Sequence, residues 1–508
     1  MQVTLAGFNV DYELIDLLQR ITNESSHRNA SFQRLEELLE ILADEPLTPE
    51  TLSAAYARIS RSPKSIRELR RDARGSLSRA RRSNEEIVFG FGHASVAEHA
   101  VVNLDITGIS RFALEALEEH RLASYTEKSQ RYVGLDPEFF IPDEIRKIGL
   151  HHEMEEYCQA QFQSYQALTE LLNNHFKTKA NSQDREKALQ DARYVLPLAF
   201  CGQVGMTMNT RTAEHVVRES RHSRFKEVRL MGKQIHDQIK RHVPSLMKYT
   251  ETNPARISSN RRVETMMQSF KPASESVEDS NVILQSAPVD AENNVVAAMI
   301  FRHGNASFSD VLATVKSWTR SEKDKWLASA HSYIDKHSIV RKELELGMFV
   351  YSITLSASAY AQLKRHRMAT LIKQDYNPSL GFTTPQCIVE AGGEGIFKEA
   401  MARADEMCKL AVKSDLREGS LAIQYILTNA HRRRVIFQAN ARELTHLSRL
   451  RLDAFAQWDI RGLSQQIIDL ARESCPGLML FAAGKDNFDS VRQSIKEKTE
   501  SSNEGSVA

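Results

Sequence analysis

The chain has 508 residues, too many for one ordinary hydrophobic core, so its length favours two domains. Hydrophobic residues make up 41% and charged residues 26% of it, as in most globular proteins, and a formal net charge of +1 gives no reason to expect binding to nucleic acid or to a membrane surface. Five scattered cysteines without a CxxC pair indicate neither a disulfide framework nor a zinc site. Because no apolar run approaches 18 residues and no basic leader opens the chain, we expect a cytoplasmic protein.

The apolar pattern predicts mostly helices with a few strands. Residues 3–5 and 101–106 alternate or run apolar as strands do, and residues 282–289 resemble a second-half copy of the first strand. Apolar residues at three- and four-residue spacing predict helices at residues 35–43, 145–176, 230–243, 395–416 and 463–475.

Composition also suggests domain boundaries. Residues 248–277 are polar, contain two prolines and read as a linker. We therefore predict a first domain at 1–250 with a helical insertion near 24–85, a linker at 251–280, a second domain at 281–483 and a flexible, charged, Ser-rich tail at 484–508.

An arginine-rich run, IRELRRDARGSLSRARR, occupies residues 66–82 of this nearly neutral chain. One interpretation is a solvated helix face. The other is a docking surface for a polyanion such as a nucleotide phosphate or a polyglutamyl tail.

The densest group of polar side chains lies between residues 93 and 131. His93-x-Ser95-x-x-Glu98-His99 precedes an apolar strand, and the run His120-Arg121-x-x-Ser124-x-x-Glu127-x-Ser129-x-Arg131 follows it. Arginine and serine at this density suit an anionic ligand with several oxygens, because a guanidinium matches phosphate bidentately. A buried ion-pair network is the structural alternative. His93 and His99 lack an obvious third ligand, so no metal site is expected.

A damaged copy of this passage returns about 246 residues later, as KRHRMATLIKQDYN from Lys364. Both halves also carry a downstream Asn-x-Arg, at Asn209 and Arg211 and at Asn440 and Arg442. The chain is therefore a tandem repeat.

These motifs resemble the signature of flavin-dependent thymidylate synthases, which is Arg-His-Arg-x-x-Ser-x-Asn-x-x-Ser-x-Arg after an upstream His-x-Ser-x-x-Glu-His. DARYVLPLAF, MTMNTR and ANARELTHLSRLRLDAFAQWDIR are similar to the family's later motifs. The resemblance covers most of both halves and implies an α+β, helix-rich fold. It would consist of two tandem copies of an antiparallel sheet with long helices.

The departures from the family pattern are complementary in the two halves. The first half has Ala116, Glu119 and Thr126 where the family has Gln, Arg and Asn, and the family's late arginine falls near Ser220. The second half has lost the upstream histidine motif. It has Asp375 and Asn377 where Ser and Arg belong, and Gln424 where the counterpart of Arg193 belongs. In the family, one site is shared between subunits. The resemblance therefore implies one composite site built from the residues that each half keeps.

The resemblance implies specific roles for those residues. Arg451 would be the catalytic cation that stabilises charge on the uracil ring. The dUMP-binding residues would be Gln362, Arg365, Glu127, Ser129, Arg131, Arg193 and Arg451. The FAD-binding residues would be His93, Ser95, Glu127, Arg365, His366, Arg367, Asn440, Arg442 and His446.

The implied reaction is reductive methylation of dUMP to dTMP by FAD, with NADPH and methylenetetrahydrofolate as co-substrates. The implied assembly is a homodimer that mimics the family's homotetramer. Two alternatives stay open. One is a catalytically degenerate flavin- or nucleotide-binding protein with a regulatory or scaffold role, and the other is flavin-dependent uracil chemistry on a different substrate.

Overall fold

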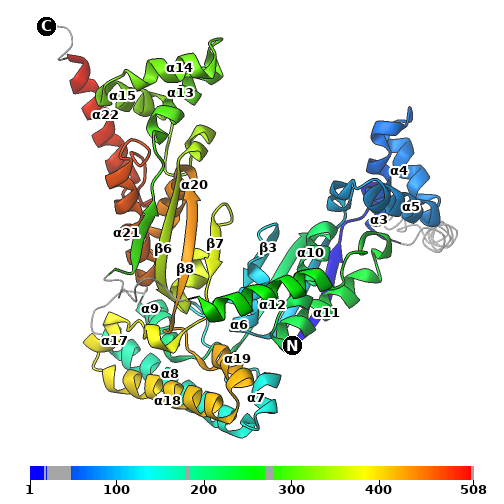
Figure 1. Ribbon diagram of the computed structural model, residues 1–508, viewed down its shortest axis with the longest axis vertical. Coiled ribbons are helices and arrows are strands. Elements are labelled where there is room, and N and C mark those ends of the chain that lie inside the picture. The colour runs from blue at the N-terminus through cyan, green and yellow to red at the C-terminus, as the bar shows by residue number, and fades with distance from the viewer. Residues whose placement is uncertain (17–18, 20–46, 178–183, 271–279, 505–508) are drawn as a thin grey trace, which may run out of the picture. The chain divides into compact units, whose positions relative to one another are not determined.

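The computed structural model describes residues 1–16, 19, 47–177, 184–270 and 280–504. The helix predicted at 35–43 and the first part of the insertion predicted near 24–85 lie outside the described residues. The rest is a helix-rich α+β structure with two four-stranded antiparallel sheets, one in each half of the sequence (Figure 1). The predicted fold class is confirmed.

The two sheets have the same topology. The first has the order β1-β2-β4-β3 and the second the order β5-β6-β8-β7, with antiparallel pairing throughout. Their strands are β1 (Gln2–Phe8), β2 (Val101–Ser110), β3 (Ala123–Glu127) and β4 (Cys201–Asn209), and β5 (Val282–Ser286), β6 (Met348–Ser356), β7 (Thr370–Lys373) and β8 (Arg432–Asn440). The sequence repeat is thus a repeat of structure.

Polar caps at repeated positions begin the helices that follow the central strands. The Ser110 hydroxyl accepts the Ala113 N–H (3.0 Å) to begin α6 (Arg111–Glu118), and the Ser356 hydroxyl does the same for Ala359 (3.0 Å) in α16 (Ala357–Leu363). Asn209 caps α10 (Thr210–His222) and Asn440 caps α20 (Ala441–Arg451), each accepting an N–H three residues on at 2.8 Å. The asparagine of each Asn-x-Arg motif therefore has a folding role of its own.

The chain forms two compact units that exchange segments between the repeats. Unit 1 contains residues 1–162, 197–273 and 406–426, and unit 2 contains residues 163–196, 274–405 and 427–508. Unit 1 is thus built mainly from the first repeat but includes a segment of the second. Unit 2 has the reverse composition.

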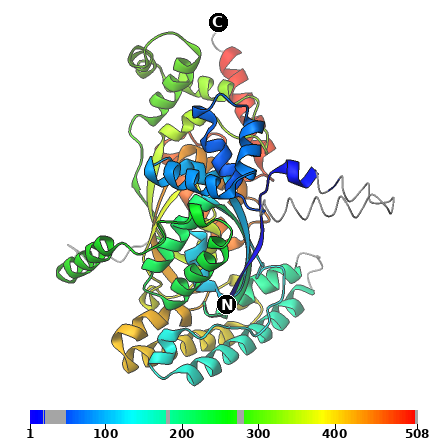
Figure 2. The same ribbon diagram turned by 90° about the vertical axis from the view of Figure 1, so that its right-hand side faces the viewer.

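Long helices supply the exchanged segments. They belong to α8 (His151–Lys177), α9 (Asp184–Ala192), α18 (Glu394–Ser414) and α19 (Leu416–Ile426). Within unit 2, the end of α8 and the start of α18 lie side by side (Figure 2), and Arg403 donates to the Ser164 hydroxyl at 2.5 Å. No helix in the described part of the chain is long and apolar enough to cross a membrane.

Each unit contains further helices. Unit 1 adds α3 (Glu50–Ala57), α4 (Ile66–Arg74), α5 (Leu77–Asn84), α7 (Asp143–Lys147), α11 (Lys226–Lys240) and α12 (Pro254–Ser269). Unit 2 adds α13 (Ala291–His303), α14 (Phe308–Lys316), α15 (Arg320–Ala330), α17 (Gln386–Glu390), α21 (Trp458–Ser474) and α22 (Phe488–Glu504). The single helix predicted at 145–176 is instead α7 and α8, because Gly149 between them has φ +77°, a left-handed conformation that ends a helix.

Two segments predicted as linker and tail contain helices. Within 251–280, the described side chains of α12 are exposed apart from the half-buried Ile257, and Asn253 caps the start of the helix. Within 484–508, α22 packs on the core of unit 2 through Phe488, Val491 and Ile495. Composition predicts a flexible tail because charged and serine residues dominate this segment. The helix depends instead on these three apolar residues at three- and four-residue spacing. The domain boundaries themselves stay predictions.

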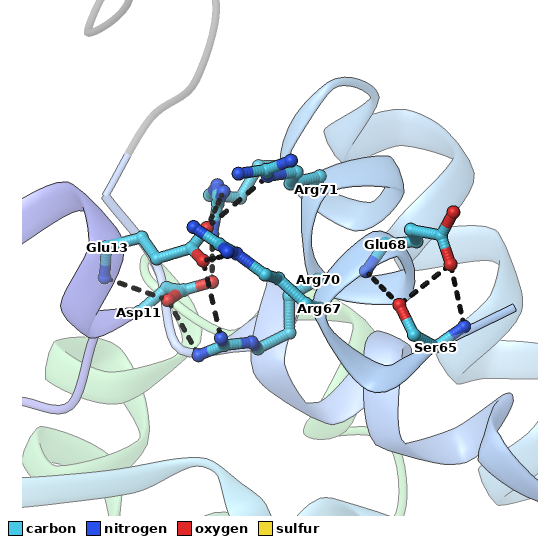
Figure 3. A network of polar contacts seen from close by, with 8 residues as sticks. Asp11, Glu13, Ser65, Arg67, Glu68, Arg70 and Arg71 are labelled. Carbon is cyan, nitrogen blue, oxygen red and sulfur yellow. Dashed lines mark hydrogen bonds and ion pairs between the residues drawn. The ribbon is translucent and has the colours of Figure 1, made fainter.

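The arginine-rich run is largely occupied by ion pairs within unit 1. Asp11 accepts from Arg70 (3.1 Å) and Arg74, and Glu13 accepts from Arg67 (2.6 Å) and Arg74 (2.8 Å), as Figure 3 shows in part. The Arg74 and Arg67 guanidinium groups lower the pKa of Glu13 to about 2. These contacts fasten α4 to the segment after β1, an outcome that neither interpretation of the run included.

Buried histidines make stability depend on pH. In unit 2, Nδ1 of His431 accepts the Thr428 N–H (3.0 Å), and burial lowers the pKa of His431 from 6.5 to about 4. Below pH 6.5 the unfolded chain binds a proton at His431 that the folded chain does not, so stability falls with pH until about pH 4. At pH 5 this residue costs on the order of 2 kcal/mol relative to pH 8.

We therefore expect His431→Asn, which retains an acceptor near Nδ1, to lose less thermal stability than the unaltered chain between pH 8 and pH 5. Exposed His303→Asn is the control and should follow the unaltered chain. The same acid-induced change in melting temperature in all three proteins would contradict the expectation.

Candidate functional site

The exchanged segment of the first repeat contributes two buried side chains to unit 2. Arg193 and Tyr194 lie in a 3₁₀ turn, Arg193–Val195, that follows α9. The Arg193 guanidinium donates to the Ser358 hydroxyl at 2.8 Å, and the Asn429 side chain donates to the Arg193 carbonyl at 3.0 Å. The sequence groups Arg193 with site residues of the second repeat. In the structure, Arg193 contacts Ser358 and Asn429 of that repeat within the same chain.

Tyr194 is the centre of a buried hydrogen-bond network. Its hydroxyl donates to Asp459 (2.9 Å) and accepts from the Gln457 side chain (2.7 Å), and Asp459 also accepts from the Ser356 hydroxyl (2.5 Å). Burial raises the pKa of Asp459, while the bonds from Ser356 and Tyr194 oppose the rise.

Unit 1 contains the matching arrangement with the repeats interchanged. Glu227 accepts the N–H (2.8 Å) and hydroxyl (2.6 Å) of Ser110, and burial raises the pKa of Glu227 to about 7. Tyr425, from the exchanged second-repeat segment, interacts with Glu227, and burial raises the pKa of this tyrosine. Each unit thus receives a tyrosine from the other repeat.

A second chain of contacts in unit 2 holds Arg451. The buried His366 ring lies 2.9 Å from the Glu443 carboxylate through Nδ1, and the Arg451 Nε donates to His366 Nε2 at 3.2 Å. Because Nε2 accepts, the neutral ring carries its proton on Nδ1 and donates it to Glu443. Burial lowers the pKa of His366, and Glu443 acts against this while the Arg451 charge adds to it.

Arg451 is also bonded to the residue predicted to lead the motif. Its Nη2 donates to the Gln362 carbonyl at 3.1 Å, and the Gln362 side chain reaches Gln457 at 3.2 Å. Gln362, His366 and Arg451 therefore share one hydrogen-bonded network with Tyr194, as the chain Arg451–Gln362–Gln457–Tyr194 shows.

A pocket of about 640 Å³ lies in unit 2 beside this network. Five residues predicted to bind the cofactor line it, namely Arg365, Arg367, Asn440, Arg442 and His446. The sequence did not single out eight further polar lining residues, namely Lys336, His337, Ser338, Glu345, Glu443, Thr445, Arg449 and Lys485. Arg449 could have been found, because it lies three residues after His446 on the same helix face. Lys336 and Lys485 reach the pocket only through tertiary structure.

The other predicted residues lie in unit 1. His93 and Ser95 are exposed, and the His93 ring is 3.3 Å from Arg61. Glu127 lies 3.6 Å from the buried Arg111, the Ser129 hydroxyl accepts the Arg131 N–H at 3.1 Å, and the Arg131 guanidinium lies over the Tyr132 ring. The composite site stays a prediction for these five residues, since none of them lines the pocket of unit 2.

The first-repeat counterpart of the His366 network is reduced. His120 stands at the position of His366 and meets His215 edge to face, as His366 meets His446. Thr212 and Ser220 occupy the positions of Glu443 and Arg451. Burial, with a smaller effect from His215, lowers the pKa of His120 to about 4. Among the described residues, no group of three His, Cys, Asp or Glu side chains could hold a metal ion.

The comparison with known proteins matches both repeats. A family described as thymidylate synthase complementing protein matches residues 41–245 and again residues 283–477. The chain belongs to this family.

Similar members of the family occur in two lengths. A UPF0159 protein of Chlamydia muridarum is 25% identical over 416 residues, 76% of this chain and 77% of its own length. A UPF0159 protein of Thermoplasma acidophilum is 22% identical over 470 residues, 84% of this chain and 93% of its own length. A flavin-dependent thymidylate synthase of Clostridium tetani is 29% identical over 218 residues, which is 42% of this chain and 85% of that protein. The first two alignments therefore extend over both repeats of this chain, and the third covers less than half of it.

The contact between Glu443 and His366 can be tested without assuming a reaction. Because the carboxylate favours the protonated ring, Glu443→Gln should lower the pKa of His366 further. NMR titration of the ring nitrogens in the full chain measures this shift. Glu345→Gln, which alters another carboxylate of the same pocket, is the control and should leave the His366 titration nearly unchanged. An unchanged His366 titration in Glu443→Gln would show that the carboxylate does not determine the state of the ring.

Proposed function

We propose that this protein is a flavin-dependent thymidylate synthase that converts dUMP to dTMP with methylenetetrahydrofolate. The observation that carries the proposal is the pocket of unit 2, where Arg365, Arg367 and Arg442 line a cavity of about 640 Å³ next to the Arg451 network. Family membership of both repeats supports the same reaction.

The pocket suits a cofactor with a pyrophosphate group such as FAD. Its walls provide guanidinium, imidazole and amide groups, which bind phosphate oxygens and the polar edge of a flavin ring. When bound, FAD would supply the redox chemistry, with NADPH as reductant and the folate as carbon donor. Arg365, Arg367, Asn440, Arg442 and His446 would hold it, with His366 fixed behind them.

Arg451 would stabilise the negative charge that develops on the uracil ring. Its bonds to His366 and the Gln362 carbonyl hold the guanidinium in one direction before substrate binds. A cation oriented in advance needs no reorganisation during the reaction, which is the condition for electrostatic catalysis. Glu443 contributes by setting the proton of His366, which in turn accepts from Arg451.

Arg193 would bind the dUMP phosphate from the same unit. It is buried and held at the Ser358 hydroxyl, and its partner segment is fixed by Tyr194. A desolvated guanidinium binds phosphate more strongly than an exposed one. Glu127, Ser129 and Arg131 are further candidates for substrate binding, and the proposed assembly is a homodimer that mimics the four-subunit assembly of the family.

A catalytically degenerate protein with a regulatory or scaffold role is the second candidate. The observation that favours it is the reduced network of the first repeat, where Thr212 and Ser220 replace the carboxylate and the arginine. An FAD absorbance spectrum without rescue of a thymidine auxotroph would identify this function instead.

Rescue of a thymidine auxotroph by the chain tests the proposal, and Arg451→Ala should abolish that rescue. Loss of one preorganised charge-stabilising group costs roughly 10²–10³ in rate. Arg221→Ala, beside the degraded first-repeat position, removes the same charge from unit 1 and should retain activity. Equal losses in the two variants would mean that Arg451 is not the catalytic cation.

Mixing two inactive variants tests whether the working half-sites lie in one chain. Arg193→Ala should weaken dUMP binding by roughly 2–5 kcal/mol, whereas Gln424→Ala, at the matching position of the second repeat, should be near neutral. Because Arg193 contacts Ser358 of its own chain, a mixture of Arg193→Ala and Arg451→Ala chains should remain inactive. Activity that appears on mixing, measured as dTMP formation, would show that the site is shared between chains.

A further inference from the structure

The pocket of unit 2 extends beyond the motif residues along one face of α20. Asn440, Arg442, His446 and Arg449 all line it. Arg449 follows Arg442 by seven positions. Because a helix rises about 1.5 Å per residue, the two arginines are roughly 10 Å apart along the helix axis. The pocket therefore has cationic groups at both ends of this helix.

Two lysines from distant parts of the sequence meet the C-terminal end of α20. Lys336 follows Asp335, whose carbonyl accepts from the Arg449 guanidinium at 2.8 Å. Lys485 follows Gly484, where a Cβ would lie 2.7 Å from the main chain of Leu452, the residue after α20. Both lysines line the pocket together with Arg449.

The turn that carries Lys336 is held in place before any ligand binds. The Asp335 carboxylate accepts the N–H groups of His337 (2.8 Å) and Ser338 (2.7 Å) and the Ser338 hydroxyl (2.7 Å). These bonds lower the pKa of Asp335, so its charge is committed to the turn. The neighbouring Asp486 carboxylate likewise accepts the N–H groups of Ala454 and Asn487.

Arg449 is a buried cation that the protein satisfies only in part. It lies over the Phe488 ring at 3.8 Å, and burial lowers the pKa of its guanidinium. Its Nε and Nη2 have no hydrogen-bond acceptor among the described residues. A buried charge of this kind is stabilised by a nearby anion even without direct contact, because the interaction is weakly screened.

The charges of the pocket are unbalanced. Its cationic lining residues are Lys336, Arg365, Arg367, Arg442, Arg449 and Lys485, and its carboxylates are Glu345 and Glu443. Glu345 is already bonded to Arg442 (2.5 Å) and Glu443 to His366 (2.9 Å). The occupant that balances such a surface carries several negative charges spread over its length.

We propose that the C-terminal end of α20 is a phosphate-binding subsite, in which Lys336 and Lys485 contact phosphoryl oxygens and Arg449 supplies a fixed buried charge. A nucleotide held by one anionic group near Arg442 would place a second phosphoryl group there. The proposal rests on the proposed function only in taking the occupant to be a nucleotide. Lysine ammonium groups suit this role because they are mobile point charges that follow phosphate oxygens.

Cations at this end of α20 could instead serve only the helix dipole. A basic group in the last turn contributes typically 0.3–1 kcal/mol to stability through that dipole. If the lysines form a phosphate subsite, removing them lowers phosphate affinity. If they serve only the helix dipole, removing them lowers the melting temperature alone.

Calorimetric titration of the full-length chain with inorganic pyrophosphate, after removal of co-purifying nucleotide, tests the subsite. Replacing two charge-assisted contacts should weaken pyrophosphate binding by roughly tenfold or more in a Lys336→Gln/Lys485→Gln variant. A Lys233→Gln/Lys398→Gln variant removes the same charge from exposed positions outside the pocket and should bind as the unaltered chain does.

Absence of pyrophosphate binding to the unaltered chain, or equal affinity in both double variants, would overturn the subsite. A lower melting temperature with unchanged pyrophosphate affinity would also overturn it, in favour of the helix dipole. If pyrophosphate binding depends on the lysines but the chain fails to rescue a thymidine auxotroph, the proposed function fails and the subsite stands.

Discussion

The bond between Tyr194 and Asp459 joins the two repeats within unit 2. A buried carboxylate is costly unless hydrogen-bond donors surround it, and here the donors come from both repeats, Tyr194 from the first and Ser356 from the second. The second repeat alone would therefore leave Asp459 under-satisfied. The cost of an unsatisfied buried carboxylate gives a physical reason why this part of the chain needs the exchanged segment.

In unit 1 the matching buried carboxylate takes its hydrogen bonds from its own repeat. Glu227 relies on Ser110 of its own repeat and interacts with Tyr425 of the other. The exchange of equivalent segments thus brings a tyrosine of the opposite repeat to each buried carboxylate. The exchange also brings Arg193 of the first repeat among the residues that the second repeat keeps.

The two repeats differ in the residues around the equivalent histidines, His366 and His120. In unit 2, Glu443 and Arg451 occupy the two ring nitrogens of His366. In unit 1, His120 has Thr212 and Ser220 at the matching positions, and burial lowers the pKa of His120 to about 4 although the Glu219 charge opposes the shift. The first-repeat histidine therefore lacks the carboxylate and the arginine that hold the His366 ring in unit 2.

Much of this organisation follows from the sequence alone. The spacing of Asn209, Arg211, Asn440 and Arg442 shows the tandem repeat, because local caps and helix periods leave a regular pattern in the chain. The set of motif arginines also follows, since each lies within a short run that resembles a motif of the family. These signals are local, and a few neighbouring residues suffice to read them.

Contacts between distant segments needed the tertiary structure. Lys336, Arg449 and Lys485 share a pocket although 149 positions (485 − 336) separate the lysines in the chain. The ion pairs of Asp11 and Glu13 with the arginine-rich run likewise join segments more than 50 residues apart. Side-chain charge and spacing describe what a residue can bind, but which partners reach it depends on how the sheets and helices pack.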